Sequence, residues 1–207
     1  MIHNIPLTLV FEDQLSEFIM SKLVSEIHLD GKPKYSVHLS FSGGGNSYIK
    51  KNIKGFNAAS KGSAYFVLTD LDNHICAPAL IQEWLNVPKN NNLILRVAIR
   101  EVESWILADI EGFSTFTGIS TANFPENPDE ISDPKAELLK IIKKSRFRSI
   151  KEDILPKNNY AKIGPNYNGR LGEFVYKHWN STRAAGRSAS LARTVKALTA
   201  FELQYSS

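Results

Sequence analysis

Cysteine is almost absent from this sequence, and so is any long run of apolar residues. The single cysteine, Cys76, has no second cysteine with which to form a disulfide, and no spacing of cysteine and histidine indicates a zinc site. No run approaches the roughly 18 apolar residues that a membrane-spanning helix needs. A signal peptide is not expected, because Pro6, Glu12 and Asp13 interrupt the apolar N-terminal stretch. We therefore expect a cytoplasmic protein that does not enter a membrane.

The composition also lacks the excess of charge that is typical of disordered chains. Apolar residues make up 43% of the 207 residues and charged residues 22%, as in ordinary globular domains. A chain of this length can build one well-packed domain with a modest appendage.

Acidic residues are scarce in the last third of the chain. Residues 134–207 carry 15 lysines and arginines against 5 aspartates and glutamates, whereas residues 1–133 carry 10 against 16. An acidic N-terminal part followed by a basic C-terminal part suits a metal-dependent enzyme that acts on a polyanion. A helical tail that exposes basic residues only for solubility gives the same distribution, so both interpretations stay open.

The first 110 residues alternate between strand-like and helix-like patterns. The apolar runs Leu7–Phe11, Ala64–Thr69 and Leu93–Ile99 predict buried strands, and the period of two in Tyr35–Phe41 predicts a fourth. Helical patterns follow the strands, over residues 12–29, 48–56, 78–85 and 101–109. This order predicts an α/β fold with a four-stranded, mainly parallel sheet, flanked by helices and connected by right-handed crossovers.

Three segments are expected along the chain: an α/β metal-binding core over residues 1–111, a surface connection over 112–134, and a helical basic extension over 135–207 that packs on the core. The connection is rich in serine, threonine, asparagine and proline and is expected to hold at most short turns. Asp133 and Pro134 predict the start of a helix, as N-cap and first helical residue.

Acidic residues follow three of the four predicted strands. Glu12 ends the first strand, Asp70 and Asp72 follow the third, and Glu101 and Glu103 follow the fourth. The carboxyl ends of parallel strands meet at one edge of a sheet, where ligands bind. Carboxylates gathered there repel one another unless a cation neutralises them, and oxygen ligands favour Mg²⁺ or Mn²⁺. We therefore expect a divalent metal ion among Glu12, Asp70 and Asp72, with Glu101, Glu103 or both.

Each of these residues also has a purely structural interpretation. Asp70 and Asp72 are suited to shape a turn, and Glu101 to begin a helix, where an acid complements the helix dipole. The coincidence of acids at three strand ends favours the metal site.

The strand end Val10-Phe11-Glu12-Asp13 and the turn Thr69-Asp70-Leu71-Asp72, together with the parallel order, resemble the TOPRIM fold of topoisomerases, primases and overcoming-lysogenization-defect nucleases. The stretches 100–109, 133–135 and 188–198 are similar to one bacterial TOPRIM-like group, so the resemblance covers most of the chain. It implies that Glu12 serves as metal ligand or general acid/base, and that Asp70 and Asp72 hold Mg²⁺. Asp13 departs from the family pattern, in which glycine usually follows the glutamate, and this weakens the analogy with topoisomerases.

The resemblance implies a Mg²⁺-dependent nuclease or phosphodiesterase acting on DNA or RNA, as the effector of a bacterial phage-defence system. A regulatory or binding subunit of an ATPase-containing complex, with little activity alone, is the alternative. A small-molecule phosphohydrolase that uses the same metal edge is a third interpretation.

The remaining candidate site residues are basic. They lie outside the acidic edge, the edge of the sheet at which Glu12, Asp70, Asp72, Glu101 and Glu103 are expected. Lys135 would offset charge on the reacting phosphate, as lysines do in related nucleases, or it is a solvated residue of a first helical turn. Arg183, Arg187 and Arg193 lie in a hydroxyl-rich stretch that suits phosphate contacts. Contact with a partner protein, or exposure to solvent, is the alternative for these arginines.

Overall fold

The structure is a computed structural model that describes residues 4–204, and it divides into two compact units. The first unit runs as far as Ala98 and takes up the chain again from Arg193, and the second is Ile99–Ala192. The first unit ends at Ala98, whereas the expected core runs to residue 111. The expected extension over 135–207 is divided between the two units, because the last helix carries the chain back into the first. No helix within residues 4–204 is both long and apolar enough to cross a membrane.

The first unit contains the expected sheet of four parallel strands. Its order is β4-β1-β5-β6, and the strands are β1 (Ile5–Val10), β4 (Tyr35–Phe41), β5 (Ala64–Asp70) and β6 (Leu93–Ala98). All three pairings are parallel, and Leu7 in the centre lies opposite both Val37 and Ala64. The prediction of a parallel α/β sheet flanked by helices is confirmed.

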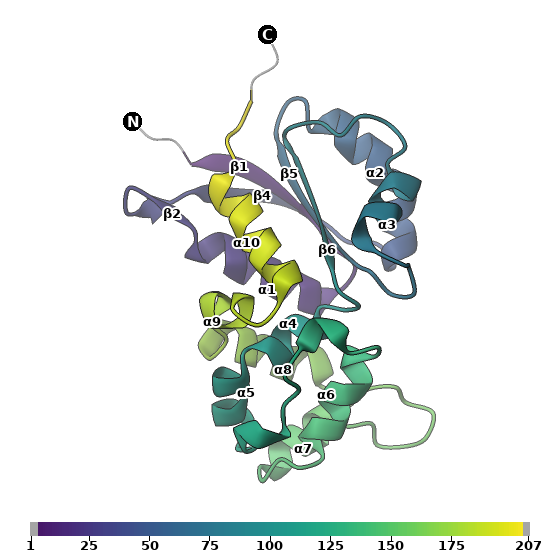
Figure 1. The fold of residues 1–207 in the computed structure, drawn as a ribbon, viewed down its shortest axis with the longest axis vertical. Coiled ribbons are helices and arrows are strands. Elements are labelled where there is room, and N and C mark those ends of the chain that lie inside the picture. The colour runs from purple at the N-terminus through teal and green to yellow at the C-terminus, as the bar shows by residue number, and fades with distance from the viewer. Residues whose placement is uncertain (1–3, 205–207) are drawn as a thin grey trace. The chain divides into compact units, whose positions relative to one another are not determined.

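Helices cover both faces of this sheet (Figure 1). The chain passes from β1 to β4 through α1 (Gln14–Glu26), then turns back through α2 (Asn46–Ala59) and α3 (Ala77–Trp84) to β5 and β6. The step from β1 to β4 and the steps from β4 to β5 and from β5 to β6 run in opposite directions across the sheet. Because crossovers between parallel strands are right-handed, α1 therefore lies on one face and α2 and α3 on the other. The apolar core fills the space between these layers, with β-strand residues such as Leu9 and Phe66 fully buried.

Two further elements complete the first unit. A hairpin of β2 (His28–Leu29) and β3 (Lys32–Pro33) turns at Asp30 and Gly31, which both have positive φ angles. Such an Asp-Gly turn is typical of tight hairpins. The last helix, α10 (Ala189–Ala200), packs near the sheet through its second half, where the Leu198 carbonyl accepts a hydrogen bond from the buried Tyr35 hydroxyl.

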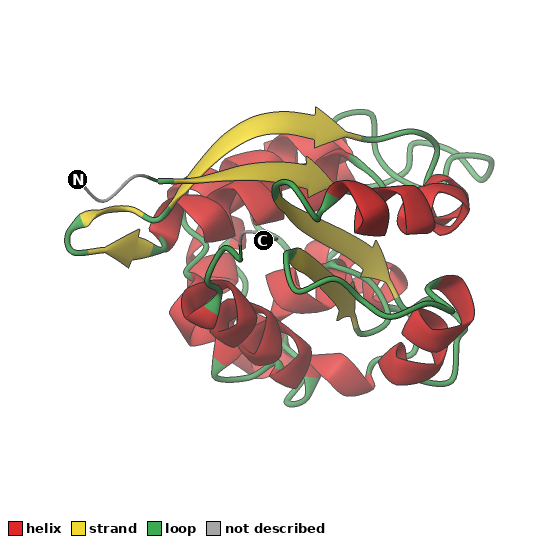
Figure 2. Cartoon of the chain, turned by 90° about the horizontal axis from the view of Figure 1, so that it is seen from above, coloured by secondary structure: helices red, strands yellow, loops and turns green. Residues whose placement is uncertain are grey.

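The second unit is helical. Figure 2 shows the strands of the chain in yellow and its helices in red. Its elements are α4 (Glu103–Ala108), α5 (Ile110–Thr117), η1 (Thr121–Asn123), η2 (Pro128–Glu130), α6 (Pro134–Ile142), α7 (Arg148–Ile154), α8 (Tyr167–Lys177) and α9 (Ser181–Ala185). The short α4 is wholly buried at the centre. Its Trp105 donates a hydrogen bond to Ser190 Oγ at 2.7 Å, and its backbone accepts one from Trp179. The predicted cap of α6 is present, with Asp133 Oδ1 accepting from the Ala136 amide at 2.8 Å.

Residues 112–134 are more ordered than the expected surface connection. Helix α5 occupies the first part and buries Phe113 and Phe116, and it ends at Gly118 with a φ of 67°. Serine and threonine between the phenylalanines weaken the helical pattern in the sequence, since both residues favour caps and turns. The aromatic packing of Phe113 against Phe174 overrides that local preference.

Candidate metal centre

The first unit brings two acidic strand ends together at a change in topology. From β1 the chain crosses to one side of the sheet, whereas from β5 it crosses to the other, so β1 and β5 are the neighbours at which the direction reverses. In open α/β sheets ligands bind beyond the carboxyl ends of the strands at this switch point. Glu12 follows β1, Asp70 is the last residue of β5, and Asp72 lies two residues further.

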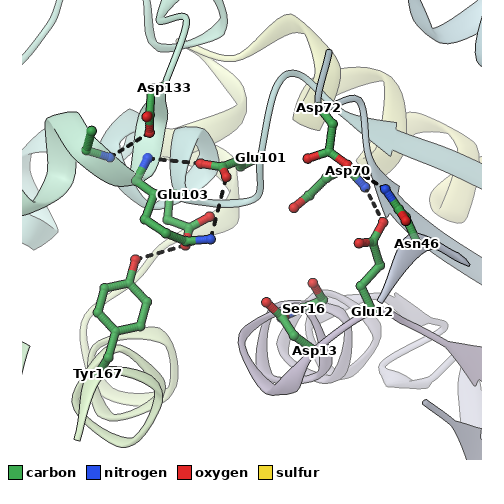
Figure 3. A network of polar contacts seen from close by, with 12 residues as sticks. Glu12, Asp13, Ser16, Asn46, Asp70, Asp72, Glu101, Glu103, Asp133 and Tyr167 are labelled. Atoms are coloured by element: carbon green, nitrogen blue, oxygen red, sulfur yellow. Dashed lines mark hydrogen bonds and ion pairs between the residues drawn. The ribbon is translucent and has the colours of Figure 1, made fainter. Parts of the chain in front are cut away.

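Hydrogen bonds from the neighbouring strand hold the Glu12 carboxylate in place. Its Oε1 accepts from the Asp70 backbone N–H at 2.9 Å (Figure 3). The Thr69 hydroxyl donates to the same oxygen. Both donors bind Oε1, so they orient the carboxylate and leave Oε2 available to a ligand. The predicted closeness of Glu12 and the end of β5 is therefore a direct contact.

Asp72 is held in an unusual backbone conformation beside this contact. Its φ is 48°, in the left-handed region that aspartate tolerates better than most residues. Its Oδ2 accepts a hydrogen bond from Asn46 Nδ2 at 2.8 Å. Asn46 begins α2 directly after Gly44 and Gly45, which have φ angles of 90° and 76°. The glycine-rich turn thus delivers an amide side chain to the acidic edge.

The surroundings of Glu12 raise the pKa of its carboxyl group. Burial is the main cause, and the negative charges of Asp72 and Asp13 add to it. The hydrogen bonds from Thr69 and Asp70 act in the opposite direction. A cation among these carboxylates would lower the pKa again, because it favours the ionised form.

Asp13 has a defined structural role. Its Oδ1 accepts a hydrogen bond from the Ser16 amide at 2.8 Å and caps α1. The side chain is therefore engaged at the helix N-terminus.

A cavity of about 360 Å³ opens beside Asp72 and is lined by Asn46, Asp72, Asn73 and His74. His74 Nδ1 lies 3.1 Å from the Leu71 carbonyl oxygen, and its Nε2 lies 3.7 Å from Glu83 Oε2. Because a carbonyl oxygen only accepts hydrogen bonds, Nδ1 is the donor in this contact. The contact with Leu71 thus orients the His74 ring within its own loop. The cavity therefore offers both hydrogen-bond donors and hydrogen-bond acceptors next to the acidic edge.

The donor set fits a hard divalent cation, because Glu12, Asp70 and Asp72 offer only oxygen. Figure 3 shows the carboxylates of Asp70 and Asp72 on the same side of the β5 end, with Glu12 reaching toward them. Within residues 4–204 no three histidine, cysteine, aspartate or glutamate side chains lie close enough together to form a ready-made metal site. The fit therefore rests on donor chemistry and placement at the switch point.

Glu101 and Glu103 form a polar cluster with Lys135 and Tyr167 inside the second unit (Figure 3). Glu101 Oε2 accepts from the Lys135 backbone N–H at 3.0 Å, and Lys135 Nζ lies 3.5 Å from Glu101 Oε1 and 3.3 Å from Glu103 Oε1. The Tyr167 hydroxyl donates to Glu103 Oε1 at 2.8 Å. Tyr167 was not anticipated, because nothing local in the sequence connects it to a glutamate 64 residues away.

Glu103 is 1% exposed, and its Oε2 has no hydrogen-bond partner among the described residues. Burial is the main cause that raises the pKa of Glu103, opposed first by the charge of Lys135. The ammonium group of Lys135 thus supplies positive charge to both glutamates. That Glu101 or Glu103 shares an ion with Asp70 and Asp72 stays a prediction, as does a catalytic role for Lys135.

Two of the three arginines expected to bind nucleic acid make contacts within the second unit. Arg183 forms two hydrogen bonds of 2.8 Å to the buried Asp109, and Arg187 donates to the Glu126 carbonyl at 2.8 Å. Arg193 is exposed on α10. A role in nucleic-acid binding stays a prediction for all three, and the structure gives Arg183 and Arg187 a part in holding the second unit together.

The parallel topology and the oxygen donors at the β1–β5 switch point are the features from which a function can be argued. Comparison of the chain with protein-family models, with curated proteins and with solved structures finds no match in any of the three.

Proposed function

We propose that the protein is a Mg²⁺- or Mn²⁺-dependent phosphodiester hydrolase that acts on nucleic acid. The observation that carries the proposal is the contact of Glu12 with the end of β5 at the topological switch point. The likeness of these residues to the TOPRIM pattern supports the same chemistry and implies a role in phage defence.

The residues of this site suit a hydrolytic displacement at phosphorus. Asp70 and Asp72 would hold the cation, which when bound supplies Lewis-acid activation of the phosphate ester and of water. Glu12 accepts the proton of the attacking water as the new P–O bond forms and the ester P–O bond breaks. Thr69 and the Asp70 amide keep the Glu12 carboxylate oriented for this step. Asn46 holds Asp72 in position.

A cleavage assay with labelled DNA and RNA, single-stranded and duplex, tests the proposal in Mg²⁺, Mn²⁺ and EDTA. We expect metal-dependent cleavage that falls at least about 100-fold in Glu12→Gln and in Asp70→Asn, as for loss of a principal catalytic group. Asp30→Asn is the matched control, because Asp30 is an exposed acid of the same unit in the β2–β3 turn. Cleavage by Glu12→Gln at the rate of the parent would refute the mechanism.

A second candidate function is a regulatory or binding subunit with little activity alone. The edge strand β4 favours it, since Val37 and Leu39 are 43% and 55% exposed there. Unprotected edges with apolar residues favour pairing with another chain. An ATPase is the partner implied by the TOPRIM resemblance. Co-purification with such a partner, with no cleavage by the isolated chain, would favour this function over hydrolysis.

The salt dependence of the reaction separates a small-molecule phosphohydrolase from a nuclease. Turnover of a mononucleotide that changes little with salt would indicate the former, because binding of a polyanion weakens steeply as salt rises.

A further inference from the structure

The segment that precedes the Asp70–Asp72 turn is strongly one-sided in charge. Residues 31–69 contain six lysines and no aspartate or glutamate. Four of these lysines lie in or just beyond α2, whose first residue, Asn46, contacts Asp72. Helix α2 therefore starts at the candidate metal centre and carries positive charge away from it.

Three of these lysines follow one another along α2 and just beyond its end. Lys50 and Lys54 lie one turn apart on the same face of the helix, and Lys61 follows in the turn just after the last helical residue, Ala59. Lys50 pairs with Glu83 at 2.6 Å, whereas Lys54 and Lys61 are exposed further along. The 14 residues of α2 span about 21 Å. Lys50, Lys54 and Lys61, here called the α2 stripe, thus run from the first turns of α2 to the turn beyond its last residue.

The α2 stripe ends in a cavity of about 620 Å³. Lys54 and Lys61 line it from one side and Lys89 from the other, and no aspartate or glutamate is among the described residues that line it. Lys89 Nζ donates to the Leu93 carbonyl at 2.8 Å, which holds the ammonium group near the start of β6.

Hydrogen bonds hold the two walls of this cavity together. Asn57, buried on α2, donates through Nδ2 to the Pro88 carbonyl at 3.0 Å, and its Oδ1 accepts from the Asn90 amide at 2.7 Å. The loop that carries Lys89 is therefore fastened to α2. Val87 and Pro88 add an apolar wall, and Val87 is 43% exposed.

We propose that the α2 stripe and its terminal cavity bind a single strand of nucleic acid whose backbone leads to the acidic edge. This inference rests on the proposed function and names the substrate path. The described lining of the cavity contains three lysines and no carboxylate, which suits phosphate groups. An apolar wall beside amide side chains suits an unstacked base, which a duplex does not offer.

Binding is measured by fluorescence anisotropy with a labelled 12-nucleotide oligothymidylate, in EDTA, over a range of salt concentrations. The test variant is Lys54→Gln/Lys61→Gln, and the control is Lys32→Gln/Lys157→Gln, which removes two exposed lysines elsewhere. We expect the test variant to bind roughly 10- to 100-fold more weakly at low salt and its log–log salt slope to be shallower by about 1.4, the value for two lost phosphate contacts on a single strand. The control is expected to bind as the parent does.

Two additional measurements locate the strand and identify its form. A 5-iodouracil oligonucleotide crosslinked by light is expected to label peptides that contain residues 54–61 and 87–91. A duplex of equal length is expected to compete more weakly than the single strand. Binding by the test variant with the parent's affinity and salt slope overturns the proposal, and so does a duplex that competes better.

Failure of this inference can be told apart from failure of the proposed function. Lysine-dependent binding without cleavage keeps the substrate path and removes the hydrolase. Metal-dependent cleavage that the test variant retains at the parent's rate and affinity keeps the hydrolase and removes the path.

Discussion

The backbone amide of Asp70 donates a hydrogen bond of 2.9 Å to the carboxylate of Glu12, across 58 residues of sequence. The contact joins the last residue of β5 to the residue that follows β1, so the two strand ends share one polar site. Thr69 adds its hydroxyl to the same oxygen. The orientation of Glu12 is thus set by a neighbouring strand.

Thr69→Val tests that orientation. Removing the hydroxyl leaves the shape of the buried side chain nearly unchanged but takes away a bond that lowers the pKa of Glu12. We expect the pH at which cleavage is half-maximal to rise and the rate at neutral pH to fall about tenfold, the scale of a hydrogen bond to a charged group. A pH–rate profile measures both. Thr8→Val, a buried threonine of the adjacent β1, is the control and should leave the profile unchanged.

Metal binding should be detectable as thermal stabilisation. A ligand that binds only the folded state stabilises it by RT ln(1 + [L]/Kd), or about 1.4 kcal/mol for 10 mM Mg²⁺ and a Kd of about 1 mM. We expect the melting temperature to rise with Mg²⁺ or Mn²⁺ in the parent and to stay constant in Asp70→Asn/Asp72→Asn. Differential scanning fluorimetry reports the change. An equal rise in the double variant would place the ion elsewhere.

Asp72 has a positive φ, and its replacements should reveal the backbone strain. Asp72→Ala and Asp72→Gly both remove the carboxylate, but only glycine adopts the left-handed region without a steric cost. We expect the glycine variant to be more stable by about 1 kcal/mol in urea unfolding. The same pair at Asp30, which has a φ of 52°, should show a similar difference. Equal stability of the two Asp72 variants would contradict the strained conformation.

Glu103 makes stability depend on pH. Its pKa is raised in the folded state, so the folded chain holds this proton more tightly than the unfolded chain, and ionisation of Glu103 lowers stability as pH rises above its ordinary value of 4.5. Glu103→Gln removes this loss while it keeps an oxygen for the Tyr167 hydroxyl. We expect the variant to gain stability relative to the parent between pH 4.5 and 7. Urea midpoints measured across that range provide the check, and Glu137→Gln serves as a control on the partly exposed surface of α6.

Arg183 should matter more for folding than Arg193. Asp109 is 1% exposed and accepts two hydrogen bonds from Arg183, so Arg183→Gln leaves a buried carboxylate without its cation. We expect a loss of about 2–3 kcal/mol in unfolding free energy, below the range for a fully buried pair because the arginine is partly exposed. Arg193→Gln should change stability by less than about 0.5 kcal/mol, as for a surface residue. Equal stability of the two variants would show that the Asp109 contact contributes little.

Local patterns were sufficient for most elements of the first unit. The alternation in Tyr35–Phe41 predicted β4 with both ends correct, and Asp133 with Pro134 predicted the start of α6. These signals depend on neighbours in sequence: the period of the side chains and the capping of free amides. The β2–β3 hairpin was missed because each of its strands has only two residues, too few to show a period.

The sequence alone determined the parallel α/β sheet and the acidic residues that follow its strands, because strand, helix and turn signals are local and the topology rules are few. Only the tertiary structure decided that Thr69 and the Asp70 amide orient Glu12, that Lys135 and Tyr167 contact Glu103, and that Arg183 binds Asp109. Those pairings join residues from 57 to 74 positions apart, except for the 32 between Glu103 and Lys135. No periodicity connects such residues, and a buried polar group finds its partner only when packing excludes water.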